Sequence, residues 1–107
     1  MNGRRDVLTD LRAWFDGHKA ELADSGFQAE YAESPPDRVK RSASVTIASP
    51  RRIGQLVVWD GGEAELTLGD SGSNEVVEEH REIISTLGLR DATQALLTWL
   101  EAGLDPL

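Results

Sequence analysis

Apolar residues near the N-terminus recur at steps of three and four. This spacing gathers them on one side of a helix and predicts a helix over about residues 4–25. Gly26 follows at the position where a left-handed helix end favours glycine, and Phe27 can fold back onto the last turn. The apolar stripe consists of Val7, Leu8, Leu11, Trp14, Phe15, His18 and Leu22. We expect Trp14 in the core and a packing role for His18.

The middle of the chain changes to a two-residue period, which is typical of strands with one buried side. Strands are predicted at residues 39–47, 53–59 and 63–68, with a turn at Ser49-Pro50-Arg51-Arg52 between the first two. Residues 28–38, before the first of them, are interpreted as an ordered connector.

The second and third predicted strands are joined by Asp60-Gly61-Gly62. This sequence favours a tight hairpin, because glycine readily adopts the positive φ angles that such a turn requires. Alternation along the third strand then separates two sets of side chains. Ala64, Leu66 and Leu68 point one way, and Glu63, Glu65 and Thr67 point the other way.

Residues 75–86 allow two interpretations. Their apolar positions fit a helical stripe that begins after Asn74, which the pattern alone slightly favours, and they also fit a fourth strand. The final helix is clearer, since Asp91 and Gln94 have the spacing of a capping box and Gly103 ends the element. Its buried stripe is Ala92, Ala95, Leu96, Trp99 and Leu100.

Negative charge is concentrated in the second half of the chain. The net charge is −8, and eight carboxylates against one arginine lie between Asp60 and Glu82. Phosphate and anionic lipid are bound by clustered Lys and Arg, so we expect neither direct nucleic-acid binding nor membrane binding. A basic protein is the natural charged partner. The alternative is that the acidic side chains only keep a small protein in solution.

Candidate chemistry is sparse. The chain has no cysteine and two histidines, and neither histidine has the ligand spacing of a metal site. No serine or threonine is marked as a nucleophile, and no glycine-rich loop carries the lysine of a phosphate site. We therefore expect no enzymatic activity, metal or cofactor. Without a signal peptide or an apolar run of 18 residues, we expect a cytoplasmic protein.

Three short motifs resemble those of the TriTu-type immunity proteins, which are small bacterial proteins of polymorphic and contact-dependent toxin systems. The first resembles the opening helix of that family, the second its central strand–turn–strand and the third its last strand. They are Leu11-Arg12-Ala13-Trp14-Phe15 with His18-Lys19 and Gly26-Phe27, then Leu56 to Leu66, and then Glu79-His80-Arg81-Glu82-Ile83. The resemblance implies that residues 75–86 form a strand, and it leaves the start of the last helix open.

With this resemblance, we expect one α+β domain over residues 1–107. Its elements would be a helix, a four-stranded antiparallel meander sheet and a second helix, with both helices on one face of the sheet. The other face would then be open, with Glu63 and Glu65 pointing toward it.

The resemblance implies an immunity protein that binds the C-terminal domain of a cognate toxin. Nuclease toxins carry basic substrate clefts, so an acidic sheet face would occlude such an active site. The expected partner-binding residues are Trp59, Asp60, Glu63, Glu65, Asp70, Glu78, His80 and Glu82. Trp59 is equally compatible with packing beneath the helices. The alternative function is a small-molecule or regulatory binding module, with a pocket between sheet and helices and a merely solubilising acidic surface. The oligomeric state is left open.

Overall fold

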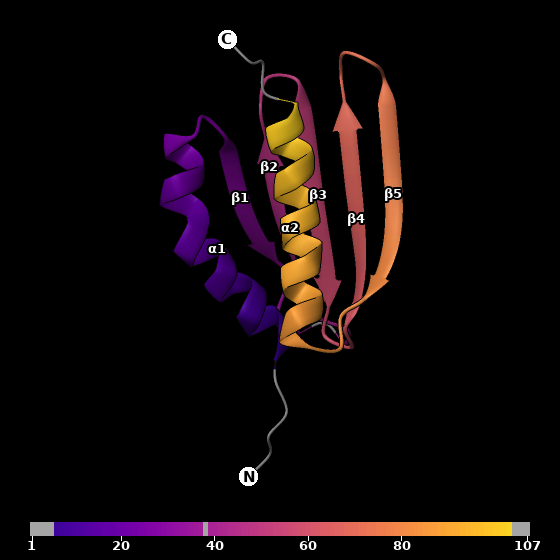
Figure 1. Cartoon of the computed structure of the whole chain (residues 1–107). Helices are drawn as coiled ribbons and strands as arrows, with labels where there is room; N and C mark the ends of the chain where they lie inside the picture. The colour runs from indigo at the N-terminus through magenta and orange to yellow at the C-terminus, as the bar shows by residue number, and fades with distance from the viewer. Residues whose placement is uncertain (1–5, 38, 104–107) are drawn as a thin grey trace.

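The fold has two layers, an antiparallel sheet and two helices that both lie on one of its faces (Figure 1). The computed structural model describes residues 6–37 and 39–103. The elements are α1 (Val7–Asp24), β1 (Gln28–Glu33), β2 (Ser42–Ala48), β3 (Arg52–Trp59), β4 (Glu63–Asp70), β5 (Glu75–Glu82) and α2 (Thr86–Ala102). The five strands form a meander in the order β1-β2-β3-β4-β5. The α+β class, the element order and the placement of both helices are confirmed.

Helix α1 begins and ends as its sequence indicates. Asp6 caps the first turn and accepts a hydrogen bond from the Leu8 N–H at 3.1 Å. At the other end Gly26 has a φ of 92°, and the Phe27 N–H donates to the Leu22 carbonyl at 3.0 Å. This is the left-handed termination that the glycine predicted. The predicted residues 4 and 5 lie outside the described part of the chain.

The sheet has one strand more than expected. Residues 28–33, interpreted from the sequence as part of a connector, form β1 and pair with β2 from Gln28↔Ala48 to Glu33↔Ala43. Ala29 and Tyr31 point toward the helices and alternate with exposed Gln28 and Glu30. Two small alanines and three charged or polar positions make this alternation too weak to stand out in the sequence. Strand β2 begins at Ser42, so the predicted start at Val39 was too early.

Most of the ambiguous stretch, residues 75–82, forms strand β5, so the slight preference for a helix there was wrong. β5 pairs with β4 along its whole length, from Asp70↔Glu75 to Glu63↔Glu82. Asn74 does not cap a helix but has a φ of 59° in the turn between the two strands. Seven of the eight β5 residues are exposed, so its valines do not form the buried stripe that the helical interpretation required.

Helix α2 starts at Thr86, six residues before Ala92, which follows the predicted cap at Asp91. Ser85 is its N-cap and accepts a hydrogen bond from the Gly88 N–H at 3.1 Å, while Gly103 ends the helix as predicted. Gly54 of β3 lies directly beneath α2, where a Cβ atom would clash with the Leu96 side chain. This glycine therefore allows the helix to pack closely on the sheet.

The core lies between the helices and strands β2 to β4. Its fully buried side chains include Leu11, Val45, Leu56, Leu66 and Leu96. The two tryptophans expected in the core lie at its margin. Trp14 stacks on His18 with ring centroids 4.5 Å apart, and Trp99 lies under the Arg52 guanidinium at 3.9 Å.

Candidate protein-binding face

The side of the sheet opposite α1 and α2, here called the open face, has no element over it among the described residues (Figure 1). Residues directly opposite each other in an antiparallel pair point to the same face, so the pairing register defines what the open face carries. Ala64 and Leu66 are buried against the helices. Glu63 and Glu65 therefore lie on the open face, as the alternation in the sequence predicted.

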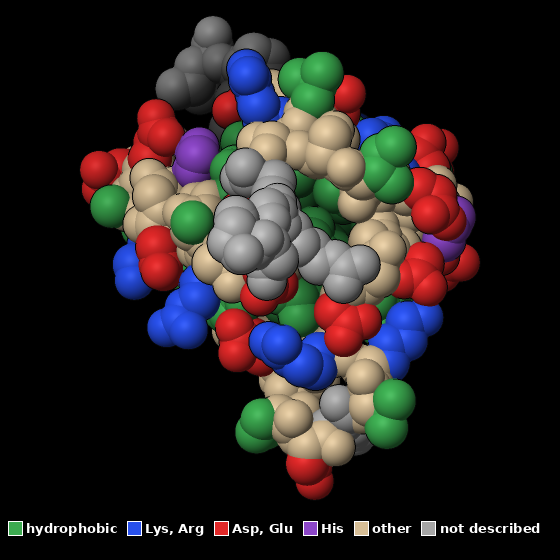
Figure 2. Space-filling view, turned by 90° about the horizontal axis from the view of Figure 1, so that it is seen from below, with side chains coloured by type: hydrophobic (Ala, Val, Ile, Leu, Met, Phe, Trp, Pro, Cys, Tyr) green, Lys and Arg blue, Asp and Glu red, His purple; other side chains and the backbone are tan. Residues whose placement is uncertain are grey.

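Three successive rows of the register bring charged or titratable side chains of β4 and β5 together. Glu63 lies opposite Glu82, and Glu65 lies opposite His80. Thr67 lies opposite Glu78 in the next row. We call the five charged or titratable residues of these rows the acidic corner: Glu63, Glu65, Glu78, His80 and Glu82. Seen from the lower end of Figure 1, acidic side chains gather around a histidine on the side where β5 lies (Figure 2).

His80 bridges two carboxylates of the acidic corner. Its Nδ1 lies 2.9 Å from Glu65 Oε2, and its Nε2 lies 3.0 Å from Glu82 Oε2. The hydrogen bond with Glu65, and then that with Glu82, raises the pKa of His80 above its ordinary value, because both favour the charged ring. When His80 loses its proton, the corner gains one unit of net negative charge.

Glu63 is the member of the corner whose charge is compensated by a lysine. The Lys40 Nζ donates to Glu63 Oε2 at 2.8 Å, and this bond is the main reason that the pKa of Glu63 is lowered. The same ammonium lies 5.9 Å from the centroid of the Trp59 ring. Trp59 is half-buried and occupies the open-face position next to Glu63 across the β3–β4 hairpin. An aromatic ring therefore adjoins the carboxylates.

Glu78 is the most available carboxylate of the corner. Within the described part of the chain, its side chain is exposed and has neither an ion pair nor a hydrogen bond. Asp60 is also exposed, but it lies in the β3–β4 turn, where its Oδ2 accepts the Arg41 N–H at 3.1 Å. Glu79 points to the helix side of β5 and pairs with Arg81 at 2.8 Å.

Asp70 lies apart from the other carboxylates. Its side chain is on the helix side of β4, is 4% exposed and accepts from Arg52 Nε at 2.6 Å and Arg51 Nε at 3.3 Å. The Arg52 bond is the main cause that holds its pKa far below the ordinary range. Arg52 also donates to the Trp99 carbonyl at 2.6 Å. Asp70 therefore anchors the end of α2 to the sheet and contributes no charge to the open face.

The sequence pattern places Glu65 and His80 in the same charged stretch, but it does not predict their contact. Their contact depends on the register, which the turn after Asp70 sets. A hairpin that turns at residues 71–74 is centred between residues 72 and 73, and positions 65 and 80 are equally distant from that centre. The signal was present in the sequence, but using it required knowing that residues 75–82 form a strand. The compensating Lys40 was missed because it comes from a distant loop.

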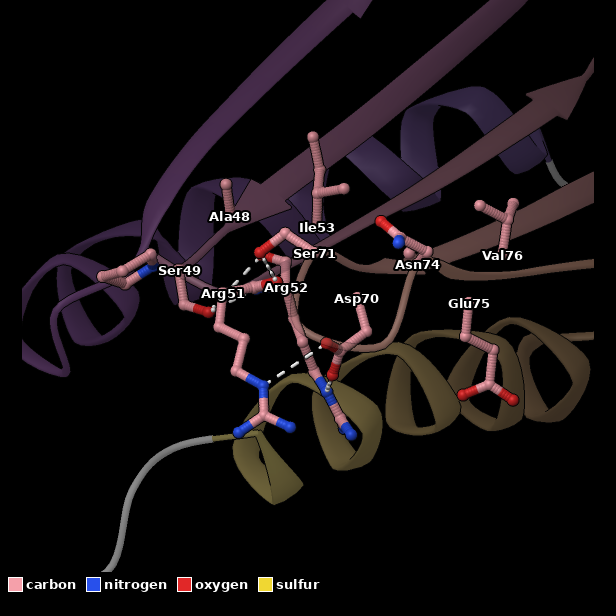
Figure 3. A pocket seen from close by; sticks show the side chains of 12 residues that line it. Ala48, Ser49, Arg51, Arg52, Ile53, Asp70, Ser71, Asn74, Glu75 and Val76 are labelled. Atoms are coloured by element: carbon pink, nitrogen blue, oxygen red, sulfur yellow. Dashed lines mark hydrogen bonds and ion pairs between the residues drawn. The ribbon is translucent and has the colours of Figure 1, made fainter.

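One hollow among the described residues lies at the far end of the sheet from Trp59 (Figure 3). It is an open depression of about 460 Å³ where Ala48, Ile53 and Val76 surround Gly69, with Arg51 and Asp70 at its rim. Arg51 and Arg52 hold the Asp70 carboxylate at this rim, as the dashed lines in Figure 3 indicate. The space between sheet and helices, where the alternative function placed a pocket, is occupied by core side chains.

The described residues contain no helix long and apolar enough to cross a membrane. They also contain no group of three or more His, Cys, Asp or Glu residues arranged to hold a metal ion.

A small α+β module with charged residues gathered on one open sheet face has the features of a binding protein. The comparison with protein families agrees with this class. The model of the immunity protein family TriTu matches residues 9–100, and the chain belongs to that family. No curated protein matches the chain. Immunity proteins are inhibitors and not enzymes, so the family confirms both an immunity function and the expected lack of enzymatic activity.

Proposed function

We propose that this protein neutralises a cognate toxin domain by placing the acidic corner on a basic surface of that domain. The observation that carries the proposal is the convergence of four carboxylates and His80 on one open face, on two paired strands. Strands of a packed sheet hold side chains in fixed relative positions, which favours a precise binding site. The proposed partner is the C-terminal domain of a toxin, and a nuclease provides the complementary chemistry.

A nuclease must attract phosphate groups, so its substrate cleft is lined by Lys and Arg. Carboxylates spaced along two strands offer negative charge to the same side chains and would exclude the nucleic acid. The immunity protein itself then needs no contact with nucleic acid. We place the encounter in the cytoplasm, where such a toxin would reach its substrate.

Trp59 supplies the apolar part of the proposed contact. It lies beside Glu63 on the open face, and large aromatic side chains often provide much of the binding energy when a partner covers them. Asp60 borders this position from the turn. Asp70 is left out of the proposed surface because its carboxylate is buried on the opposite side of the sheet and bound by two arginines.

Two measurements test this function. Co-expression with the toxin encoded beside the gene should rescue growth, and the purified domains should form a complex whose affinity falls as salt rises, because complementary charge accelerates association. Absence of both rescue and binding would contradict the immunity role toward that toxin. Affinity that does not respond to salt, with binding of a small molecule in the depression beside Ile53, would favour the alternative binding module.

Charge reversal then tests the surface. Glu65→Lys with Glu78→Lys should weaken binding by about tenfold or more, since like charges would face each other across the interface. Glu21→Lys with Glu101→Lys changes the net charge equally, at exposed positions on the helices. This control should change affinity by less than about threefold, because only long-range electrostatics are altered. Equal effects of the two double variants would refute the acidic corner as the contact and leave the immunity function intact.

A further inference from the structure

Strand β5 is an exposed sheet edge. In the part of the chain that the structure describes, it is the last strand of the sheet, seven of its eight residues are exposed, and no helix lies in front of it (Figure 1). An edge strand presents unpaired backbone N–H and C=O groups, which can pair with another extended chain.

The hydrogen-bond pattern identifies the outward groups. The Ile83 N–H donates to the Gly62 carbonyl at 2.7 Å, which makes these two residues a hydrogen-bonded pair. Hydrogen-bonded and non-hydrogen-bonded pairs alternate along an antiparallel ladder. Every second residue from Ile83 therefore bonds to β4, and the intervening residues direct their backbone groups away from the sheet. The outward residues are Val76, Glu78, His80 and Glu82.

These four residues are also the ones whose side chains lie on the open face. Three of them, Glu78, His80 and Glu82, belong to the acidic corner. A strand added to β5 would place the side chains opposite them on the same face. The unpaired backbone groups and the acidic corner thus form one continuous surface.

The other edge of the sheet differs in this respect. A hydrogen bond of 2.9 Å from the Ser34 N–H to the Ser42 carbonyl fixes the alternation of β1. It directs the backbone groups of Ala29, Tyr31 and Glu33 outward. Ala29 and Tyr31 pack on the core, and the Tyr31 ring lies 5.7 Å from that of Phe15 in α1. The outward positions of β1 thus lie on the helix side, whereas those of β5 lie on the open face.

We propose that β5 accepts an extended, basic segment of the toxin as a sixth strand. The inference rests on the proposed function and specifies how the partner is held. β5 carries four glutamates and one arginine, so a basic strand complements it. A second copy of β5 would place strands of the same negative charge side by side, which disfavours self-pairing.

The register predicts the sequence pattern of the incoming segment. The residues opposite Glu78 and Glu82, four positions apart, would be Lys or Arg, because cross-strand neighbours of opposite charge attract. The residue opposite Val76 would be apolar, since Val76 is 66% exposed beside the depression that Ile53 also lines. Main-chain hydrogen bonds would supply affinity, and alternate side chains would supply specificity.

Amide hydrogen exchange tests the proposal directly. The probe is the toxin domain encoded beside the gene, in a catalytically inactive form. Binding should slow exchange at the amides of Val76, Glu78, His80 and Glu82 by about tenfold or more, because these N–H groups become hydrogen-bonded. The outward amides of β1 at Ala29, Tyr31 and Glu33 should not change. Slowed exchange at β1 instead of β5 would overturn the assignment.

A pair of substitutions at one position isolates the backbone contribution. His80→Pro removes an outward N–H without removing a bond to β4, which is where an edge strand tolerates proline. His80→Ala removes the same side chain and keeps the N–H. We expect His80→Pro to bind the toxin domain about tenfold more weakly than His80→Ala. Glu33→Pro, the equivalent change at the outer edge of β1, should bind like the unmodified protein. Circular dichroism and melting temperature verify that each variant is folded.

The outcomes separate this inference from the function on which it rests. Equal affinity of the two His80 variants, with unchanged exchange in β5, overturns the added strand and leaves the immunity function in place. The charges of β5 would then only guard the edge against aggregation. A dimer of the free protein that protects the same four amides would assign the edge to a second copy. If the unmodified protein does not bind the toxin domain at all, both the inference and the proposed function fail.

Discussion

Strands β3 and β5 have the same length and belong to the same sheet, but β3 is largely buried and β5 is largely exposed to solvent. In β3, Leu56 and Val58 are fully buried beneath the helices, and Trp59 is half-buried on the open face. In β5, seven of eight residues are exposed. β3 packs against α2 on one face and pairs with a strand on each edge, whereas β4 is the only described strand that pairs with β5.

One part of the sheet therefore stabilises the fold, and another part carries the residues proposed for recognition. The free energy of folding comes mainly from burying apolar side chains, and within the sheet that burial is concentrated in β2 to β4, beneath the helices. The residues proposed for recognition lie on the open face and along β5, where they contribute little to the core. Substitutions in the two regions should therefore differ in their effects on stability and on toxin binding.

The largest expected effect is on the stability contributed by β3. Leu56→Ala should lower the free energy of unfolding by about 2–5 kcal/mol, because it removes a fully buried side chain and leaves a cavity. Val76→Ala in β5 should change it by less than about 0.5 kcal/mol, since this side chain is largely exposed. Urea unfolding followed by tryptophan fluorescence measures both. Equal losses would show that β5 is as important for stability as β3.

The next largest expected effect is a loss of stability at Gly62, where the β3–β4 turn contacts the end of β5. Gly62 has a φ of 98°, and a Cβ atom there would lie 2.6 Å from the Ile83 carbonyl oxygen. Gly62→Ala should cost about 1–3 kcal/mol of stability, from an unfavourable backbone conformation and displacement of the end of β5. Gly17→Ala is the matched control, because its Cβ would meet no atom within 4 Å in α1. It should stabilise by up to about 1 kcal/mol. A Gly62→Ala protein as stable as the unmodified one would contradict the close approach to Ile83.

The same contrast explains what the sequence predicted and what it did not. Elements that bury a regular stripe were found, as in α1 and in the alternation of β4, because burial leaves its period in the residues. β5 was assigned only through the family resemblance, since a strand exposed on both faces carries no such period. β1 was missed because its inner face carries Ala29 and Glu33 on either side of Tyr31, so a single large residue marks it.

The proposed site, too, could be predicted only in part from the sequence. The orientation of Glu63 and Glu65 followed from alternation within one strand, which sequence shows directly. The contact of Glu65 with His80 and that of Asp70 with Arg52 depend on pairing between strands. Asp70 was therefore grouped with the other carboxylates, although Arg52 lies directly opposite it in β3. Charge counted along the chain does not reveal on which face each charge lies.

A smaller effect concerns Asp70, on the helix side of the sheet. Bonds from Arg52 and Arg51 hold its pKa below the ordinary value, so its stabilising contribution is present above the unfolded pKa of about 3.8. It is lost as pH falls through the lower, folded-state pKa. Asp70→Asn should therefore destabilise the protein at neutral pH, and this difference should shrink on acidification. Urea unfolding between pH 7 and pH 2.5 measures it. A stability difference that stays constant over this range would show that proton binding at Asp70 is not linked to folding.

The smallest effect is at His80, where stability and recognition should respond to pH in opposite directions. Glu65 and then Glu82 raise the pKa of His80, so its stabilising contribution is full below the unfolded value of 6.5 and is lost as pH rises through the folded-state pKa. The same deprotonation makes the acidic corner more negative and should strengthen binding of a basic toxin domain, by roughly two- to fivefold. His80→Gln keeps a neutral side chain and should remove both pH dependences. Titration calorimetry between pH 6 and pH 8, corrected for buffer ionisation, compares the two proteins. Tighter binding at pH 6 would mean that the partner presents an acidic group to His80. That result would contradict the proposal that a basic surface of the toxin contacts the acidic corner.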